Sequence, residues 1–141
     1  MKKIFKSLFV FTTGIIIGYY LCNINLISEI FSNTYKAFQI GVYTDYSVAN
    51  TYKQKYSNSI IIKDNELYRV YAAILKNSNN IENMSKYLKK NNIEFFLRDI
   101  NIEDKYLVNE LNEYEKLMDN DNEIVFLEVN KLIIEKYKES L

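Results

Sequence analysis

The sequence predicts an α+β fold in which a four-stranded antiparallel sheet of βαββαβ order carries both of its helices on one face. Strand-like and helix-like segments alternate between residues 36 and 102. The apolar pattern of the first half of this segment returns in the second half, at an offset of 32 residues. The chain has 141 residues and no proline, and 48% of its residues are hydrophobic. This length and this hydrophobic fraction are sufficient for one packed core. We expect three parts: 1–35, 36–102 and 103–141.

Residues 1–35 carry the features of a membrane anchor. Three lysines within the first six residues precede an apolar run from Leu8 to Cys22. The run is shorter than the ~20 residues of a full span, but no cleavage site of small residues follows, and apolar residues resume between Leu26 and Phe31. Because the lysines precede the run, we expect a single-pass transmembrane helix in the cell membrane, with a cytoplasmic N-terminus and an extracytoplasmic C-terminal domain. A cleaved signal peptide is the alternative.

The segment 36–102 contains the elements of the sheet domain. Alternating apolar residues predict four strands, at residues 37–43, 59–63, 67–73 and 93–98. Asp45 or Ser47 caps a helix after the first strand, and Asn79 or Asn80 caps a helix after the third. The dipeptide Asp64–Asn65 predicts a tight turn between the second and third strands.

The two halves of this segment are copies of one strand–helix unit. Seven pairs of apolar or small residues match at the offset of 32: Phe38 with Val70, Ile40 with Ala72, Gly41 with Ala73, Tyr43 with Leu75, Ala49 with Ile81, Tyr52 with Met84 and Tyr56 with Leu88. A βαββαβ order of this kind gives one antiparallel sheet with both helices packed on the same side. The other face of the sheet is left for binding.

Strand alternation divides the side chains between the two faces. We expect the helices to cover Phe38, Ile40, Ile60, Ile62, Val70, Ala72, Phe95 and Leu97. The opposite, open face would carry Gln39, Gly41, Tyr43, Ile61, Lys63, Arg69, Tyr71, Phe96 and Arg98. Aromatic rings beside amide and guanidinium groups suit a sugar, because its C–H faces lie on the rings while its hydroxyls take hydrogen bonds. Alternatively, the C-terminal segment covers part of this face, and Phe96 and Tyr71 serve as core residues.

Residues 37 to about 100 resemble the SPOR domain, the sporulation-related repeat of bacterial cell-envelope proteins. The pattern Gln-x-Gly followed by a small residue and an aromatic stands at Gln39–Tyr43, and an alanine follows the glycine by eight residues, at Ala49. The third strand contains the family's Tyr-Arg-Val at Tyr68–Val70. Where the family continues with Gly-Pro-Phe, this chain has Ala73–Ile74–Leu75.

The resemblance implies a βαββαβ domain that binds the glycan strands of peptidoglycan, particularly those stripped of stem peptides. Gln39 would be the polar contact on the sheet, within the motif that also contains Gly41, and Tyr43, Arg69 and Tyr71 would lie on or beside the same surface. Strand alternation adds Phe96 and Arg98. The predicted function is therefore a non-enzymatic, membrane-anchored module at a division or sporulation site. The alternative is a protein-interaction adaptor that kept the fold and lost glycan binding.

The C-terminal part, residues 103–141, predicts an acidic pair of helices with a net charge of −6. Apolar residues recur at helical spacing in both: Leu107, Leu111, Tyr114 and Met118, then Ile124, Phe126, Val129, Ile133 and Tyr137. Acidic residues at Asp119, Asp121 and Glu123 alternate as in a calcium loop, but Ile124 and Asn130 stand where such a loop needs Gly and Glu. We expect a polar turn there. The helices could pack on the sheet domain, self-associate or bind a protein partner.

Composition removes several classes of function. The chain has no His, no Trp and one Cys, which excludes Ser-His-Asp catalysis, Cys/His zinc sites and an internal disulfide. The expected open face has no pair of carboxylates for glycoside cleavage. The net charge of zero and the weakly basic sheet domain argue against nucleic-acid binding. We therefore expect neither an enzyme nor a cofactor.

Overall fold

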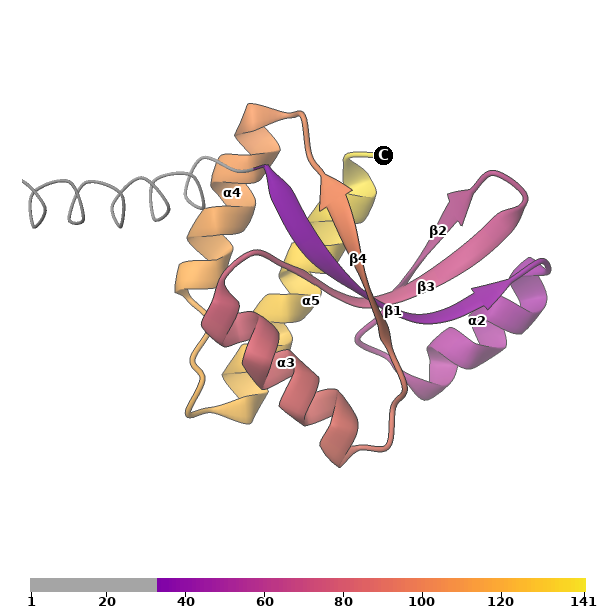
Figure 1. Cartoon of the computed structure of the whole chain (residues 1–141), viewed down its shortest axis with the longest axis horizontal. Helices are drawn as coiled ribbons and strands as arrows, with labels where there is room; N and C mark the ends of the chain where they lie inside the picture. The colour runs from indigo at the N-terminus through magenta and orange to yellow at the C-terminus, as the bar shows by residue number, and fades with distance from the viewer. Residues whose placement is uncertain (1–32) are drawn as a thin grey trace, which may run out of the picture. The chain divides into compact units, whose positions relative to one another are not determined.

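The computed structural model describes residues 33–141, which contain four strands and four helices (Figure 1). The strands are β1 (Thr34–Tyr43), β2 (Ile60–Asp64), β3 (Leu67–Leu75) and β4 (Phe96–Asn101). The helices are α2 (Tyr46–Lys55), α3 (Ser78–Lys90), α4 (Lys105–Lys116) and α5 (Glu123–Glu139). The predicted α+β class is confirmed. The predicted transmembrane helix falls in residues 1–32, outside the described part, and no helix of residues 33–141 has the length and apolar character of a membrane span.

The strands form one sheet in the order β2-β3-β1-β4, and every neighbouring pair is antiparallel. The predicted four-stranded antiparallel sheet is therefore confirmed. The starts of two strands differ from the prediction by three residues each. β1 begins at Thr34, before the expected domain boundary at residue 36, and β4 begins at Phe96 instead of residue 93. The later start of β4 follows a turn in which Asn92 has a φ of 56°, a left-handed conformation that asparagine tolerates.

The offset of 32 residues appears in the helix starts. α2 begins at Tyr46 after the N-cap Asp45, and α3 begins at Ser78 after the N-cap Asn77. Each capping side chain accepts hydrogen bonds from the two backbone N–H groups that lie two and three residues further on. Asp45 was one of the two predicted caps of its helix. Asn79 and Asn80 were the wrong choice for the second helix, because their backbone N–H groups are the donors to Asn77.

Two irregularities in the β1–β3 pairing change which side chains share a face. Gln39 lies opposite Tyr71, and Gly41 lies opposite Val70, so that β1 advances two residues while β3 advances one. Residues directly opposite each other in an antiparallel pair share a face, and consecutive residues of β3 point to opposite faces. The bulge at Ile40 therefore puts Gln39 and Gly41 on opposite faces of the sheet.

This bulge corrects several predicted positions. Gly41 and Tyr43 lie on the face of Val70 and Tyr68, which α2 covers, and not on the face of Gln39. β2 is likewise reversed relative to the prediction, because Ile61 and Lys63 pair with Val70 and Tyr68. The remaining β2 residues, Ile60, Ile62 and Asp64, are on the face of Arg69 and Gln39.

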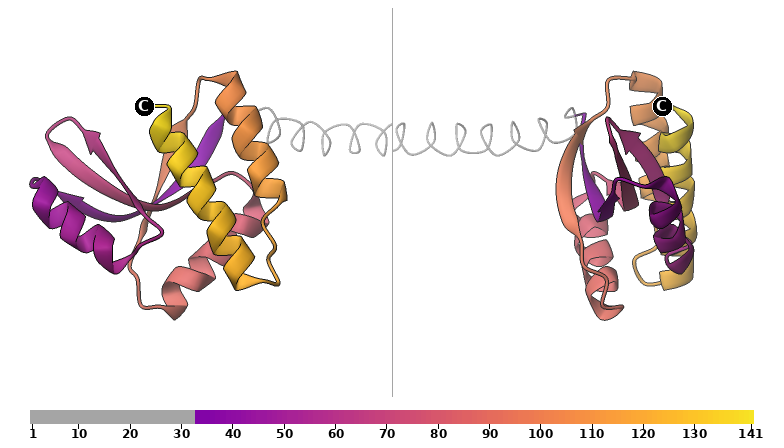
Figure 2. Two further views of the ribbon diagram at one scale, coloured as in Figure 1. Left: turned by 180° about the vertical axis from the view of Figure 1, so that it is seen from behind. Right: turned by 90° about the vertical axis from the view of Figure 1, so that its right-hand side faces the viewer.

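The C-terminal helices run antiparallel to each other and pack on the sheet (Figures 1 and 2). α4 covers one end of the Gln39 side of β1, where the Tyr35 hydroxyl lies 3.2 Å from the Val108 carbonyl oxygen and 2.9 Å from Asn112 Oδ1. Tyr35 and Ala37 are fully buried there. The alternative prediction, that the C-terminal segment covers part of the open face, is therefore confirmed.

α5 lies against β3 beyond the end of β2. Pairing between β2 and β3 stops at Ile60 and Tyr71, so that the next residues of β3 have a partner strand on one side only. On the other side, Asn130 Nδ2 of α5 donates a hydrogen bond of 2.8 Å to the Ala72 carbonyl oxygen. Every residue from Val70 to Leu75 is buried. α5 thus covers an edge that would otherwise expose unpaired backbone groups.

Candidate functional site

One side of the sheet holds a group of polar side chains next to exposed apolar ones. We call this side the Gln39 face. Strand pairing puts its members on one side of four strands: Gln39, Val42, Ile62, Asp64, Arg69, Tyr71, Phe96 and Arg98. Five of the seven predicted site residues belong to it. Gly41 and Tyr43 do not, because of the bulge at Ile40.

Two arginines converge on Gln39 and Asp64 at the centre of this face. Arg69 Nη1 donates a hydrogen bond of 3.0 Å to Gln39 Oε1, and Arg69 Nε donates one of 2.6 Å to Asp64 Oδ2. Arg98 Nη1, from the far edge strand β4, lies 3.5 Å from the same two oxygens. Four strands thus hold one polar cluster in place, and its two guanidinium groups face a single carboxylate.

Asp64 is a member of the site that the sequence analysis missed. The pair Asp64–Asn65 was read as a turn, and Asn65 does turn the chain, with a φ of 56°. Asp64 is also the last residue of β2, on the same face as Ile60 and Ile62. Strand alternation predicts that face to lie under the helices, and only the pairing of β2 with β3 puts it on the Gln39 side. The hydrogen bond from Arg69 holds the pKa of the Asp64 carboxyl below its usual value, which keeps this group ionised and unsuited to donate a proton.

Apolar side chains on the same face flank the polar cluster. Phe96 lies directly opposite Gln39 and is 65% exposed, and Val42 lies opposite Arg69 and is 40% exposed. An exposed ring next to hydrogen-bonding groups is an arrangement that accepts the C–H face of a sugar. Of the predicted contacts, Phe96, Arg69, Arg98 and Gln39 therefore stand together at the surface.

Tyr71 belongs to this face by register but is only 4% exposed. Burial raises the pKa of its hydroxyl, and the nearby Arg98 and Arg69 guanidinium groups act in the opposite direction. Because it is buried, its side chain offers almost no surface to a ligand. The alternative prediction that Tyr71 and Phe96 are core residues is therefore correct for Tyr71 and wrong for Phe96, which is exposed.

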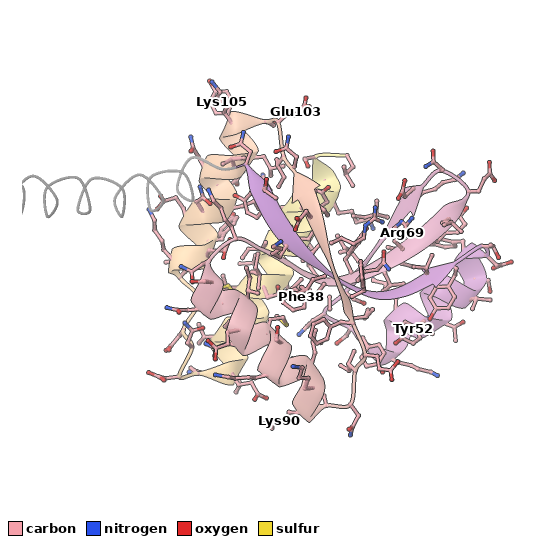
Figure 3. All side chains as sticks on the ribbon, viewed as in Figure 1. Phe38, Tyr52, Arg69, Lys90, Glu103 and Lys105 are labelled. Atoms are coloured by element: carbon pink, nitrogen blue, oxygen red, sulfur yellow. The ribbon has the colours of Figure 1, made fainter. Side chains whose placement is uncertain are left out.

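Gly41 and Tyr43 have a structural role on the other face. The Tyr43 ring lies over Gly41, so that a Cβ added at Gly41 would meet Tyr43 Cε2 at 2.7 Å. Tyr43 also packs against Tyr52 of α2, with 5.5 Å between ring centroids. In Figure 3 Arg69 lies over the strands, whereas Tyr52 lies on α2. The glycine of the Gln-x-Gly pattern thus makes room for an aromatic ring that joins β1 to α2.

Within residues 33–141 no group of three or more His, Cys, Asp or Glu side chains is arranged to hold a metal ion. Comparison of the chain with protein-family models finds no match, and neither a curated protein nor a solved structure matches it.

Proposed function

We propose that the Gln39 face binds the glycan strands of peptidoglycan, as part of a membrane-anchored, non-enzymatic cell-envelope protein. The observation that carries the proposal is the cluster itself: Gln39, Arg69 and Arg98 are held together by hydrogen bonds next to the exposed ring of Phe96. Fixed donors beside an aromatic surface match the alternating polar and apolar faces of a pyranose chain. The resemblance of Gln39–Tyr43 and Tyr68–Val70 to SPOR motifs supports the same ligand.

The cluster also favours a particular form of the glycan. Two guanidinium groups face one carboxylate, so that the cluster has a net positive charge, and planar guanidinium groups bind carboxylates with paired hydrogen bonds. Removal of stem peptides by an amidase leaves a free carboxylate on each muramic acid. The stripped glycan is therefore the better ligand for this face.

The test is sedimentation of the purified full-length chain, in a neutral detergent, with bacterial sacculi. Intact sacculi are compared with sacculi that an amidase has stripped of stem peptides. We expect enrichment on the stripped material and loss of that enrichment in Phe96→Ala. Leu97→Ala is the matched control, because Leu97 is also exposed, at 39%, but lies opposite Phe38 on the other face. Equal binding by both variants would place the glycan elsewhere on the molecule.

The second candidate is an interaction adaptor of the cell envelope that has lost glycan binding. The observation that favours it is the covering of Tyr35 and Ala37 by α4, which leaves a shorter exposed face than an uncovered sheet would have. Failure of the wild-type chain to sediment with either form of sacculi would favour this second function.

A further inference from the structure

A cavity of about 200 Å³ opens where α2, the β2–β3 hairpin and the last turn of α5 meet. Its lining comes from four elements: Tyr46, Asn50 and Lys53 of α2, Ile61 and Lys63 of β2, Tyr68 of β3 and Lys138 of α5. Ile61, Lys63 and Tyr68 belong to the α2 side of the sheet, so that this cavity lies on the side opposite to the Gln39 face.

The charged side chains that line this cavity are all positive. Three lysines from three different elements line it, and no carboxylate does. Other lysines among residues 33–141 form ion pairs with carboxylates, such as Lys36 with Asp99 and Lys90 with Glu123. None of these ion pairs involves Lys53, Lys63 or Lys138. Three ammonium groups around one hollow give it a positive potential, which attracts anions.

The type of cation indicates the type of anion. Lysine is a compact point charge with three rotatable donors, whereas a carboxylate is matched best by the planar fork of arginine. Lysines that approach from separate elements fit an anion whose several oxygens point in different directions, as those of a phosphate do. The hydroxyls of Tyr46 and Tyr68 and the amide of Asn50 are further hydrogen-bonding groups of the lining.

Aromatic rings form the second half of the cavity. Tyr46 is 54% exposed and meets Tyr68 edge-on, with 5.4 Å between ring centroids, and Lys63 Nζ lies 5.9 Å from the centre of the Tyr68 ring. The exposed ring of Tyr46 offers an apolar surface that a sugar ring would cover.

We propose that this cavity is a binding site for a sugar phosphate, with the phosphate among Lys53, Lys63 and Lys138 and the sugar ring against Tyr46. The site is separate from the Gln39 face, and it stands whether or not that face binds glycan.

Isothermal titration calorimetry of the full-length chain in neutral detergent tests the proposal with glucose 6-phosphate as the probe. We expect saturable, salt-sensitive binding of glucose 6-phosphate and none of glucose. Lys63→Glu and Lys138→Glu should each weaken binding at least tenfold. Lys89→Glu is the matched control for net charge, because Lys89 is an exposed lysine on α3 away from the cavity, and it should change the affinity less than twofold.

Further outcomes decide the two halves of the proposal. Tyr46→Leu should weaken glucose 6-phosphate severalfold and leave the affinity for inorganic phosphate unchanged, and an unchanged affinity for both would overturn the role of the ring. Equal weakening by Lys89→Glu and Lys63→Glu would reduce the effect to overall charge. Binding to vesicles of phosphatidylglycerol without any binding of glucose 6-phosphate would make the lysines a membrane-facing patch and overturn the sugar-phosphate site. Thermal unfolding of each variant checks that the fold is intact.

Discussion

β1 and β3 occupy equivalent places in the two copies of the strand–helix unit, and yet their burial differs. β3 is buried at every position from Val70 to Leu75, whereas β1 keeps Gln39 and Val42 accessible. The difference comes from α5, which lies against the outer side of β3 where β2 has ended. The burial of β3 thus depends on α5, a segment far along the chain. β1, the strand that remains partly exposed, is the one that contains Gln39.

The largest expected effect comes from removing the cover of β3. Ile133 of α5 is fully buried, and Ile133→Ala should lower the free energy of unfolding by about 3 kcal/mol through lost apolar burial and the cavity that remains. Denaturant unfolding measures the change. Ile124→Ala is the control on the same helix, because Ile124 is 71% exposed and should cost less than about 0.5 kcal/mol. Equal effects would mean that α5 does not share the core of the sheet.

The hydrogen bond at the edge of β3 is the next largest contribution. Asn130→Ala leaves the buried Ala72 carbonyl without its side-chain partner, and we expect a loss of about 1–2 kcal/mol. We do not expect a larger loss, because the substitution also has a favourable effect. It removes Asn130 Oδ1, which is buried without a hydrogen-bond partner among the described residues. Asn109→Ala, at an exposed position of α4, should be nearly neutral in the same unfolding experiment.

The two helix caps compare the copies directly. Asp45→Ala and Asn77→Ala should each cost about 1 kcal/mol, because each removes one capping acceptor for two backbone N–H groups. The effects should add in the double variant, since the two sites share no partner. Asp121→Ala, in the exposed turn between α4 and α5, is the control. A much larger cost at Asn77 would show that its side chain, and not only its backbone, is part of the contact with α4.

The smallest effect is the pH dependence that Glu115 contributes at the second copy. Glu115 of α4 accepts hydrogen bonds from the backbone N–H groups of Lys76 and Asn77, and the first copy has no equivalent carboxylate. Burial raises the pKa of Glu115 above its ordinary value of 4.5, although these hydrogen bonds oppose the change. A raised pKa in the folded state means that the contribution of Glu115 to stability is greatest below pH 4.5 and declines as the pH rises.

The measurement is the free energy of unfolding of wild type and Glu115→Gln between pH 4 and 7. The difference between wild type and variant should shift in favour of wild type as the pH falls. A difference that shifts the other way would mean that the hydrogen bonds from Lys76 and Asn77 outweigh the burial of the charge.

Local patterns in the sequence predicted much of the fold. The offset of 32 residues anticipated the equivalent starts of α2 and α3, and apolar spacing anticipated α4 and α5. At the candidate site, alternation placed Gln39, Arg69, Phe96 and Arg98 together correctly. The same rule failed for Gly41 and Tyr43, because a bulge inserts one residue and reverses alternation beyond it, and no residue pattern marks where β1 slips against β3.

The sequence by itself determined the class of the fold, the repeated strand–helix unit and the chemical types on its sheet, because periodicity and capping are local properties of the chain. Only the tertiary structure decided which side chains meet. It joined Asp64 to Arg69 and Arg98, buried Tyr71, and brought Lys138 to a hollow lined by Lys53 and Lys63. These encounters depend on strand register and on the docking of α4 and α5, which are set by the packing of segments distant in the chain.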